Sequence, residues 1–205
     1  MSAAVEPGRG ASRRRGDALR NAIFDAVLEQ LRTVGYAKLT VESVAAASGT
    51  GKAAIYRRWP GRQELVADAL RHALPSPADV PPHDDPRDAV LALLRAMRDA
   101  FAATSGAAFQ AVMAEAAFLQ SIVNDQVIEP CERSIRVVLQ DAVAAGRLGP
   151  RVRPELIARI GPAMLLHHGL TIGPDIPEEY LVSVVDEVIL PVIGPAPSGS
   201  PAGRA

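Results

Sequence analysis

The residues best suited to bind an anion lie at positions 49–62, GTGKAAIYRRWPGR, where Lys52, Arg57 and Arg58 follow a glycine-rich opening. One interpretation is a phosphate-binding loop, which requires the spacing G-x-x-x-x-G-K-S/T between a strand and a helix. Here the glycines are spaced differently, an alanine follows Lys52, and a helical pattern precedes the segment. The sequence therefore excludes a phosphate loop of that type.

Residues 52–59 separate into two faces when they are placed on a helix at about 100° per residue. Ile55 and Trp59 fall on one side, which we expect to face the core. Lys52 and Tyr56 lie at one flank, where both suit phosphate oxygens. The outward side holds small and cationic residues: Ala53, Ala54, Arg57 and Arg58. The alanines would let the backbone approach a nucleic-acid groove, and the arginines could bind guanine edges or phosphates.

The residues before this stretch supply a partner helix. Thr40 is a natural N-cap for the short helix VESVAAAS, and Gly49 can adopt the left-handed conformation that ends it. The next helix is expected from about Lys52 to Trp59, before Pro60. Two short helices joined by such a turn form helix-turn-helix geometry. The alternative is that the arginines only solvate an exposed helix face; the surrounding pattern favours DNA.

The net charge of −1 combines two oppositely charged parts of the chain. Residues 1–72 carry 12 Lys/Arg and 7 Asp/Glu, whereas residues 73–205 carry 10 and 16. Only the N-terminal part is therefore suited to meet a polyanion. The single cysteine, Cys131, excludes an intramolecular disulfide, and no apolar run is long enough to span a membrane. We expect a cytoplasmic protein.

Helical periodicity and an aromatic content of only 4% predict an all-α chain of about nine helices. The expected divisions are a basic arm at 1–16, a helix-turn-helix domain at 17–74, a proline-rich linker at 75–86, a helical domain at 87–193 and a tail at 194–205. The first helix is expected over about 17–34. The later helices are expected at about 86–103, through 109–118, through 127–146 with a kink at Pro130, at 154–170 with an interruption at Gly161-Pro162, and at 178–193.

The segment LTVESVAAASGTGKAAIYRRWPGRQELVADAL, residues 39–70, resembles the signature of the tetracycline-repressor family of bacterial transcriptional regulators. The resemblance implies a homodimer that binds a palindromic double-stranded DNA operator and releases it when a small-molecule effector binds. It implies N-terminal DNA-binding helices, C-terminal helices for the effector and the dimer, no enzymatic activity and no cofactor. Operator-bound protein would be associated with the nucleoid.

The family pattern also assigns individual DNA contacts by position. The phosphate contacts it implies are Thr40, Lys52, Tyr56, Arg58 and Arg62. The base-facing residues it implies are Ala53, Ala54 and Arg57. Two positions depart from the pattern, because Gly51 replaces a Ser or Thr that caps the recognition helix and Gly61 replaces a Ser before the next helix.

An effector pocket is expected among the middle helices, lined by Met97, Phe101, Phe109, Met113, Phe118, Met164 and His168. Core packing explains each of these residues equally well, and the shortage of inward polar groups indicates a largely apolar effector. The adjacent His167 and His168 point about 100° apart on a helix, so no metal site is expected.

Three further interpretations stay open. Arg13, Arg14 and Arg15 could enter a neighbouring minor groove or form a solubilising arm. The chain could be a ligand-binding or protein-interaction module of this fold that no longer binds DNA, for which Gly51 is the only support. An all-helical enzyme is disfavoured, because the sequence offers no catalytic constellation.

Overall fold

The computed structural model describes residues 8–74, 80–113, 116–149 and 153–193, with side chains from residue 16 onward. Every regular element in these ranges is helical, as the sequence predicted. The N-terminal domain comprises α1 (Gly8–Thr33), α2 (Gly35–Lys38), α3 (Val41–Ala47), α4 (Lys52–Tyr56) and α5 (Arg62–Ala73). The C-terminal domain comprises α6 (Pro86–Ala103), α7 (Ala107–Met113), α8 (Ala117–Val123), the π-helical turn η2 (Asn124–Ile128), α9 (Glu129–Ala144), α10 (Pro154–Thr171), α11 (Glu178–Ser183), the π-helical turn η3 (Val184–Ile189) and α12 (Leu190–Ile193).

The first helix carries the N-terminal core. Its predicted stripe of Ile23, Val27 and Leu31 is fully buried, and α1 packs against α3 and α5. The helix starts at Gly8, well before the expected start near Asp17. The side chains of Arg13, Arg14 and Arg15 and the expected tail at 194–205 lie outside the described residues.

The short helix α2 was missing from the sequence prediction. Gly35 has a positive φ of 75°, which breaks the chain direction directly after α1. The helical turn then comprises only the four residues Gly35–Lys38 before Leu39 returns to an extended conformation. A single turn has no apolar periodicity to detect, so sequence reasoning could not find it.

The helix α6 runs through the centre of the C-terminal domain and begins as the sequence predicted. Asp85 caps it by accepting hydrogen bonds from the N–H groups of Arg87 at 2.8 Å and Asp88 at 3.2 Å, with Pro86 at the first helical position. Its buried face packs mainly against α9 and also against α10. This face contains Val90, Leu94, Met97 and Phe101.

Two prolines follow π-helical turns. At Pro130, where the sequence predicts a kink, the helix has the π turn η2, in which the Glu129 N–H bonds to the Asn124 carbonyl five residues back. Proline has no N–H, and its ring crowds the carbonyl four residues earlier, so a wider turn accommodates it. Pro191 follows the turn η3 in the same way, and there the Leu190 N–H bonds to the Val185 carbonyl five residues back.

The expected interruption of α10 at Gly161-Pro162 is wrong. The helix continues through both residues, which are buried. A Cβ atom at Gly161 would lie 2.7 Å from Leu94 Cδ2, and one at Gly169 would lie 2.1 Å from the Phe109 ring. These glycines let the backbone of α10 approach α6 and α7 closely. The close packing stabilises the continuous helix by more than it loses through the one backbone hydrogen bond that Pro162 cannot donate.

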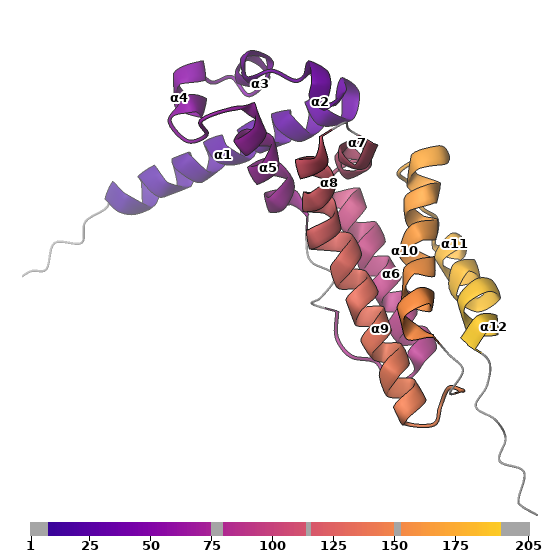
Figure 1. Cartoon of the computed structure of the whole chain (residues 1–205). Helices are drawn as coiled ribbons and strands as arrows, with labels where there is room; N and C mark the ends of the chain where they lie inside the picture. The colour runs from indigo at the N-terminus through magenta and orange to yellow at the C-terminus, as the bar shows by residue number, and fades with distance from the viewer. Residues whose placement is uncertain (1–7, 75–79, 114–115, 150–152, 194–205) are drawn as a thin grey trace, which may run out of the picture.

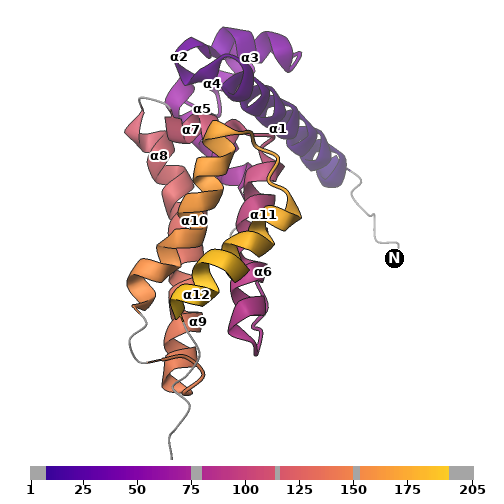
Figure 2. The same cartoon turned by 90° about the vertical axis from the view of Figure 1, so that its right-hand side faces the viewer.

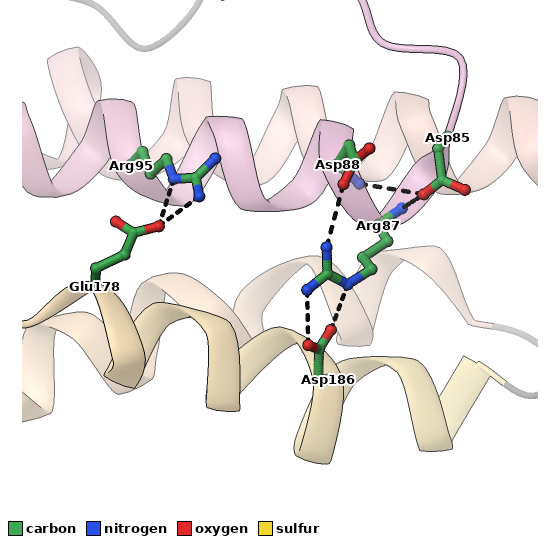
Figure 3. A network of polar contacts seen from close by, with 6 residues as sticks. All are labelled: Asp85, Arg87, Asp88, Arg95, Glu178 and Asp186. Carbon is green, nitrogen blue, oxygen red and sulfur yellow. Dashed lines mark hydrogen bonds and ion pairs between the residues drawn. The ribbon is translucent and has the colours of Figure 1, made fainter.

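Ion pairs join α6 to the C-terminal helices, as Figure 3 shows. Arg87 forms a bidentate pair with Asp186, at 2.6 and 2.7 Å, and its hydrogen bonds hold the pKa of the Asp186 carboxyl below its usual value. Glu178 accepts hydrogen bonds from both Arg95 and Arg98, which lower its pKa in the same way. The α11–η3 segment is thereby fastened along α6 by charge as well as by apolar contact.

Figures 1 and 2 show the N-terminal domain at one end of a bundle formed by α6, α9 and α10, with α11–α12 alongside α10. The loop between α9 and α10 lies at the opposite end of the bundle (Figure 1). Within the described ranges, no helix combines the length and the apolar composition that a membrane crossing requires.

Candidate nucleic-acid interface

The helices α3 and α4 are joined by a turn that the sequence signalled. Gly49 is left-handed, with φ of 65°. Its N–H bonds to the Ala46 carbonyl and the Thr50 N–H bonds to the Ala45 carbonyl, the hydrogen-bond pattern of a Schellman motif. The motif ends α3 abruptly and sets the direction in which α4 leaves.

The predicted N-cap at Thr40 is confirmed. The Thr40 hydroxyl accepts the Ser43 N–H at 3.1 Å, and the Ser43 hydroxyl accepts the Thr40 N–H at 3.2 Å, so the two residues form a capping box. Ser43 also donates to Gln30 on α1 at 2.6 Å. The Thr40 side chain is exposed but already holds the start of α3.

The inward face of the recognition helix is as predicted. Ile55 is fully buried and Trp59 is 6% exposed. The indole N–H of Trp59 donates to Asp68 on α5 at 2.9 Å, and its ring packs against Phe24 at a centroid distance of 5.6 Å. The helical conformation ends at Tyr56, earlier than expected. Trp59 nevertheless keeps its position, because its backbone N–H donates to the Ile55 carbonyl.

The outward side leaves small and cationic groups accessible. Ala53 is exposed, Ala54 is half-buried and Tyr56 is 49% exposed. Arg57 is exposed and has no side-chain hydrogen bond or ion pair to the described residues, whereas Arg58 reaches the Gly16 carbonyl of α1 at 3.4 Å. An unengaged guanidinium beside two alanines can enter a groove and form a bidentate contact with a base.

Lys52 has a partner that sequence reasoning missed. Its ammonium group lies 2.9 Å from the Glu42 carboxylate on α3, and this hydrogen bond lowers the pKa of Glu42. Both side chains are more than half exposed, at 56% and 53%. The pair holds α3 and α4 together at their N-terminal ends and sets Lys52 where a phosphate would compete with a carboxylate.

Arg62 is engaged within the protein. Its Nη1 donates to the Leu39 carbonyl at 3.0 Å and the Tyr36 carbonyl at 3.3 Å, and its guanidinium lies 4.2 Å from the centre of the Tyr36 ring. The Tyr36 ring in turn meets Phe118 of α8 edge-on at 5.3 Å. Arg62 therefore fixes α2 and the residue that follows it, Leu39, and Tyr36 connects α2 to the C-terminal domain.

Gly51 leaves α4 without a side-chain cap. The residue is the N-cap, with φ of −81° and ψ of 144°, and neither it nor Thr50 supplies a capping hydrogen bond. A Cβ atom at Gly51 would meet no atom within 4 Å. The cap is therefore missing because glycine has no side chain, and the space around position 51 would accommodate a serine.

The residues expected to line an effector pocket occupy different surroundings. Three of them, Met97, Phe101 and Phe109, are buried core residues, with the two phenylalanine rings stacked at 4.4 Å. Met113 is 65% exposed. The other three are Phe118 and Met164, which are half-buried, and His168, which is buried against Tyr180 with its Nδ1 unpaired among the described residues.

Comparisons with known proteins agree over most of the chain. Residues 23–69 match the family model described as bacterial regulatory proteins of the tetR family, and residues 80–188 match that of the tetracyclin repressor-like C-terminal domain. The DNA-binding transcriptional repressor TetR of Mycobacteroides abscessus is 28% identical over 190 residues, covering 88% of this chain and 97% of that protein. An uncharacterized HTH-type transcriptional regulator of Mycobacterium bovis is 28% identical over 173 residues, covering 82% and 85%.

Solved structures show the same fold. A TetR family transcriptional regulator from Thermus thermophilus superposes with a TM-score of 0.63 at 19% identity, covering 80% of this chain and 96% of that one. A fatty acid degradation regulator from Bacillus halodurans gives a TM-score of 0.65 at 14% identity, covering 85% and 94%. At these identities the likeness extends to the architecture alone.

Proposed function

The chain belongs to the tetracycline-repressor family of bacterial transcriptional regulators, and we propose that it acts as a dimeric repressor whose affinity for a palindromic operator is controlled by a small, largely apolar effector. The observation that carries the proposal is the outward face of α4, where Arg57 has no side-chain partner among the described residues and Ala53 and Ala54 leave room for a groove wall. Ile55 and Trp59 hold that face rigidly on the core.

Each proposed DNA contact has a role that follows from its surroundings. Arg57 reads bases, with Ala53 and Ala54 against the groove. Tyr56 and Arg58 bind phosphates, and Lys52 exchanges Glu42 for a phosphate. Thr40 offers its hydroxyl to a phosphate from the start of α3.

Arg62 is the weakest member of the proposed set. Its guanidinium already binds the carbonyls of Tyr36 in α2 and of Leu39, so its contribution to DNA binding is chiefly to hold the segment that leads into α3 in position.

Exposed apolar side chains on one layer of helices support the proposed homodimer. The helix α10 and the α11–α12 segment face the viewer in Figure 2. Leu156 in α10 is 66% exposed, Ile172 directly after α10 is 75% exposed, and Val192 in α12 is 59% exposed. Large apolar side chains left open to solvent in this way favour a symmetric partner. A dimer would place two α4 helices on successive major grooves, about 34–36 Å apart, and an effector that changes this spacing would release the operator.

The test measures binding to the DNA upstream of the protein's own gene at several salt concentrations, by fluorescence anisotropy. Affinity should fall steeply with salt, because phosphate contacts release counterions. Replacing Arg58 with alanine should weaken binding to all sequences and reduce the salt slope by about 1. Replacing Arg57 should instead reduce discrimination between base pairs, by about 1–3 kcal/mol at the positions it reads.

Arg153→Ala is the matched control, since it removes an exposed arginine at the N-cap of α10, outside the proposed DNA-binding face. Its salt slope and its sequence preference should equal those of the wild type. DNA affinity that does not respond to salt, or equal losses in all three variants, would contradict the proposal. Binding of a ligand without any binding of DNA would favour the alternative, a module of this fold that has lost its operator.

A further inference from the structure

A cavity of about 280 Å³ lies between the end of the linker and the helices α6 and α9. One wall is formed by residues 80–83, which run alongside α9 toward the start of α6 (Figure 1). The opposite wall comes from Ala89 and Leu93 on α6 and from Val137 and Val138 on α9. The cavity is on the solvent side of these helices, away from the stacked Phe101 and Phe109.

The linker wall is fixed at its C-terminal end. Arg147, in the loop after α9, donates to the Asp84 carbonyl. The next residue, Asp85, caps α6 through the N–H groups of Arg87 and Asp88. These contacts hold residues 80–83 over the groove between α6 and α9, so the cavity is built into the fold rather than left by a loose segment.

The lining of the cavity defines the chemistry of its ligand. Its body is apolar, formed by Val80, Pro81, Leu93 and the two valines of α9, while Ser134, His83 and Arg133 are its polar members. Arg133 supplies a permanent positive charge, and among the described residues none that lines the space is acidic. Arg133 pairs with Glu129 at 2.7 Å, but both side chains are more than half exposed, and an exposed pair of this kind is easily exchanged.

We propose that this cavity is the effector site and that it binds a small amphipathic carboxylate. The apolar part of the ligand lies between the linker and Leu93, Val137 and Val138, and its carboxylate replaces Glu129 as the partner of Arg133. A volume near the lower end of the about 300–1,000 Å³ typical of ligand sites indicates a molecule smaller than most drugs.

The position of the site gives it a direct route to the DNA-binding domain. The wall at 80–83 follows closely in sequence after α5, the last helix of that domain. A ligand that wedges against residues 80–83 would displace the wall itself, which is how the site would affect the preceding domain. The DNA-release part of this inference rests on the proposed function, whereas binding of the carboxylate stands without it.

The binding experiment uses the full chain and straight-chain carboxylates from hexanoate to decanoate, measured by isothermal titration calorimetry. At least one should bind, and the alcohol of the same length should bind at least about tenfold more weakly, because it lacks the charge-assisted contact. Arg133→Met should weaken carboxylate binding by a similar factor. Val137→Asp, which adds a negative charge at a position that is 47% exposed, should abolish it.

Arg153→Ala, outside the cavity, should bind the carboxylate like the wild type. No binding by any member of the series would overturn the proposal. Equal binding of acid and alcohol, or affinity that survives both cavity variants, would also overturn it, and the latter would place the ligand elsewhere. The folded state of each variant is checked by its circular dichroism spectrum and its thermal midpoint.

A second measurement separates this inference from the proposed function. The tightest-binding carboxylate should weaken binding of the wild type to the upstream DNA, and Val137→Asp should show no such response. DNA binding that no carboxylate changes would contradict the effector role. Carboxylate binding by a protein that never binds DNA would contradict the proposed function, but it would still support the inferred carboxylate site.

Discussion

At the scale of single residues, Gly51 is the position where the DNA-binding face is least secured. The helix it precedes has only five residues, and none of its first N–H groups is satisfied by a capping side chain. The first turn of α4 is held instead by the Lys52–Glu42 pair and by the burial of Ile55. A side-chain oxygen at position 51 would add the missing contact without displacing any neighbour.

Gly51→Ser should therefore stabilise the N-terminal domain. Gly51→Ala is the matched control, because both changes reduce the entropy of the unfolded chain and only serine supplies an oxygen. We expect the serine variant to exceed the alanine variant by about 0.5–2 kcal/mol in the free energy of unfolding, measured by urea denaturation. Equal stability of the two variants would show that α4 gains nothing from a cap.

The sequence identified some residue roles and could not identify others. The inward positions of Ile55 and Trp59 follow from helical spacing, and the cap at Thr40 follows from residue type. Arg62 also matches a DNA-contact position, but its carbonyl partners lie 23 to 26 residues earlier in the chain. No local pattern reports a contact across that separation, because only the tertiary fold brings Arg62 to these carbonyls.

At the scale of elements, the two π-helical turns explain apolar rows that a regular helix would not keep straight. Buried residues recur every four positions through η2 and again through η3. The first row is Leu119, Val123, Val127, Cys131, Ile135 and Leu139, and the second is Leu181, Val185, Ile189 and Ile193. In a regular α-helix, residues four positions apart point in directions that differ by about 40°, so a row of such residues winds gradually around the helix axis. The extra residue of one π turn reverses about 100° of this winding. Apolar residues that recur every four positions next to a proline could therefore have predicted a π turn from the sequence.

Two glycines of α10 should respond differently to substitution. In Gly169→Ala the new methyl group would strike the Phe109 ring, which is held against Phe101, and overpacking should cost about 1–3 kcal/mol. In Gly161→Ala the nearest atoms are the terminal methyl groups of Leu94, which can rotate away. Since both changes raise helix propensity equally, Gly169→Ala should have the lower urea midpoint. A larger loss at Gly161 would contradict this account of the close approach.

At the scale of the whole molecule, ion pairs hold the C-terminal helices against α6 at the centre of the bundle. The pKa of Asp186 and that of Glu178 are both lowered by arginines on α6. A carboxyl whose pKa is lower in the folded than in the unfolded state stabilises the fold above its unfolded pKa. That contribution disappears as the pH falls through the folded pKa. The α11–η3 segment should accordingly loosen from α6 in acid, below about pH 4.

Asp186→Asn tests this dependence. The variant should have a lower thermal midpoint than the wild type at pH 7, and the difference should be smaller at pH 3, because the wild type loses this stabilisation progressively as the pH falls below the unfolded pKa. Glu187→Gln removes a neighbouring exposed carboxyl that has no ion pair among the described residues, and it should leave the midpoint nearly unchanged at both values. A difference between Asp186→Asn and the wild type that is independent of pH would contradict the assigned role of the ion pair.

The π turn η2 also bears on how this protein can diverge. It separates α8, whose Phe118 meets Tyr36 of the DNA-binding domain, from α9, whose Arg133 and Val137 line the cavity. Loss of one residue between 124 and 128 would convert the turn to regular α-helix. Because the π turn already removes about 100° of rotation for its surplus residue, the two parts would keep their relative orientation and their apolar rows. This short stretch is therefore a place where related chains could differ in length by one residue and still conserve the communication between their two ends.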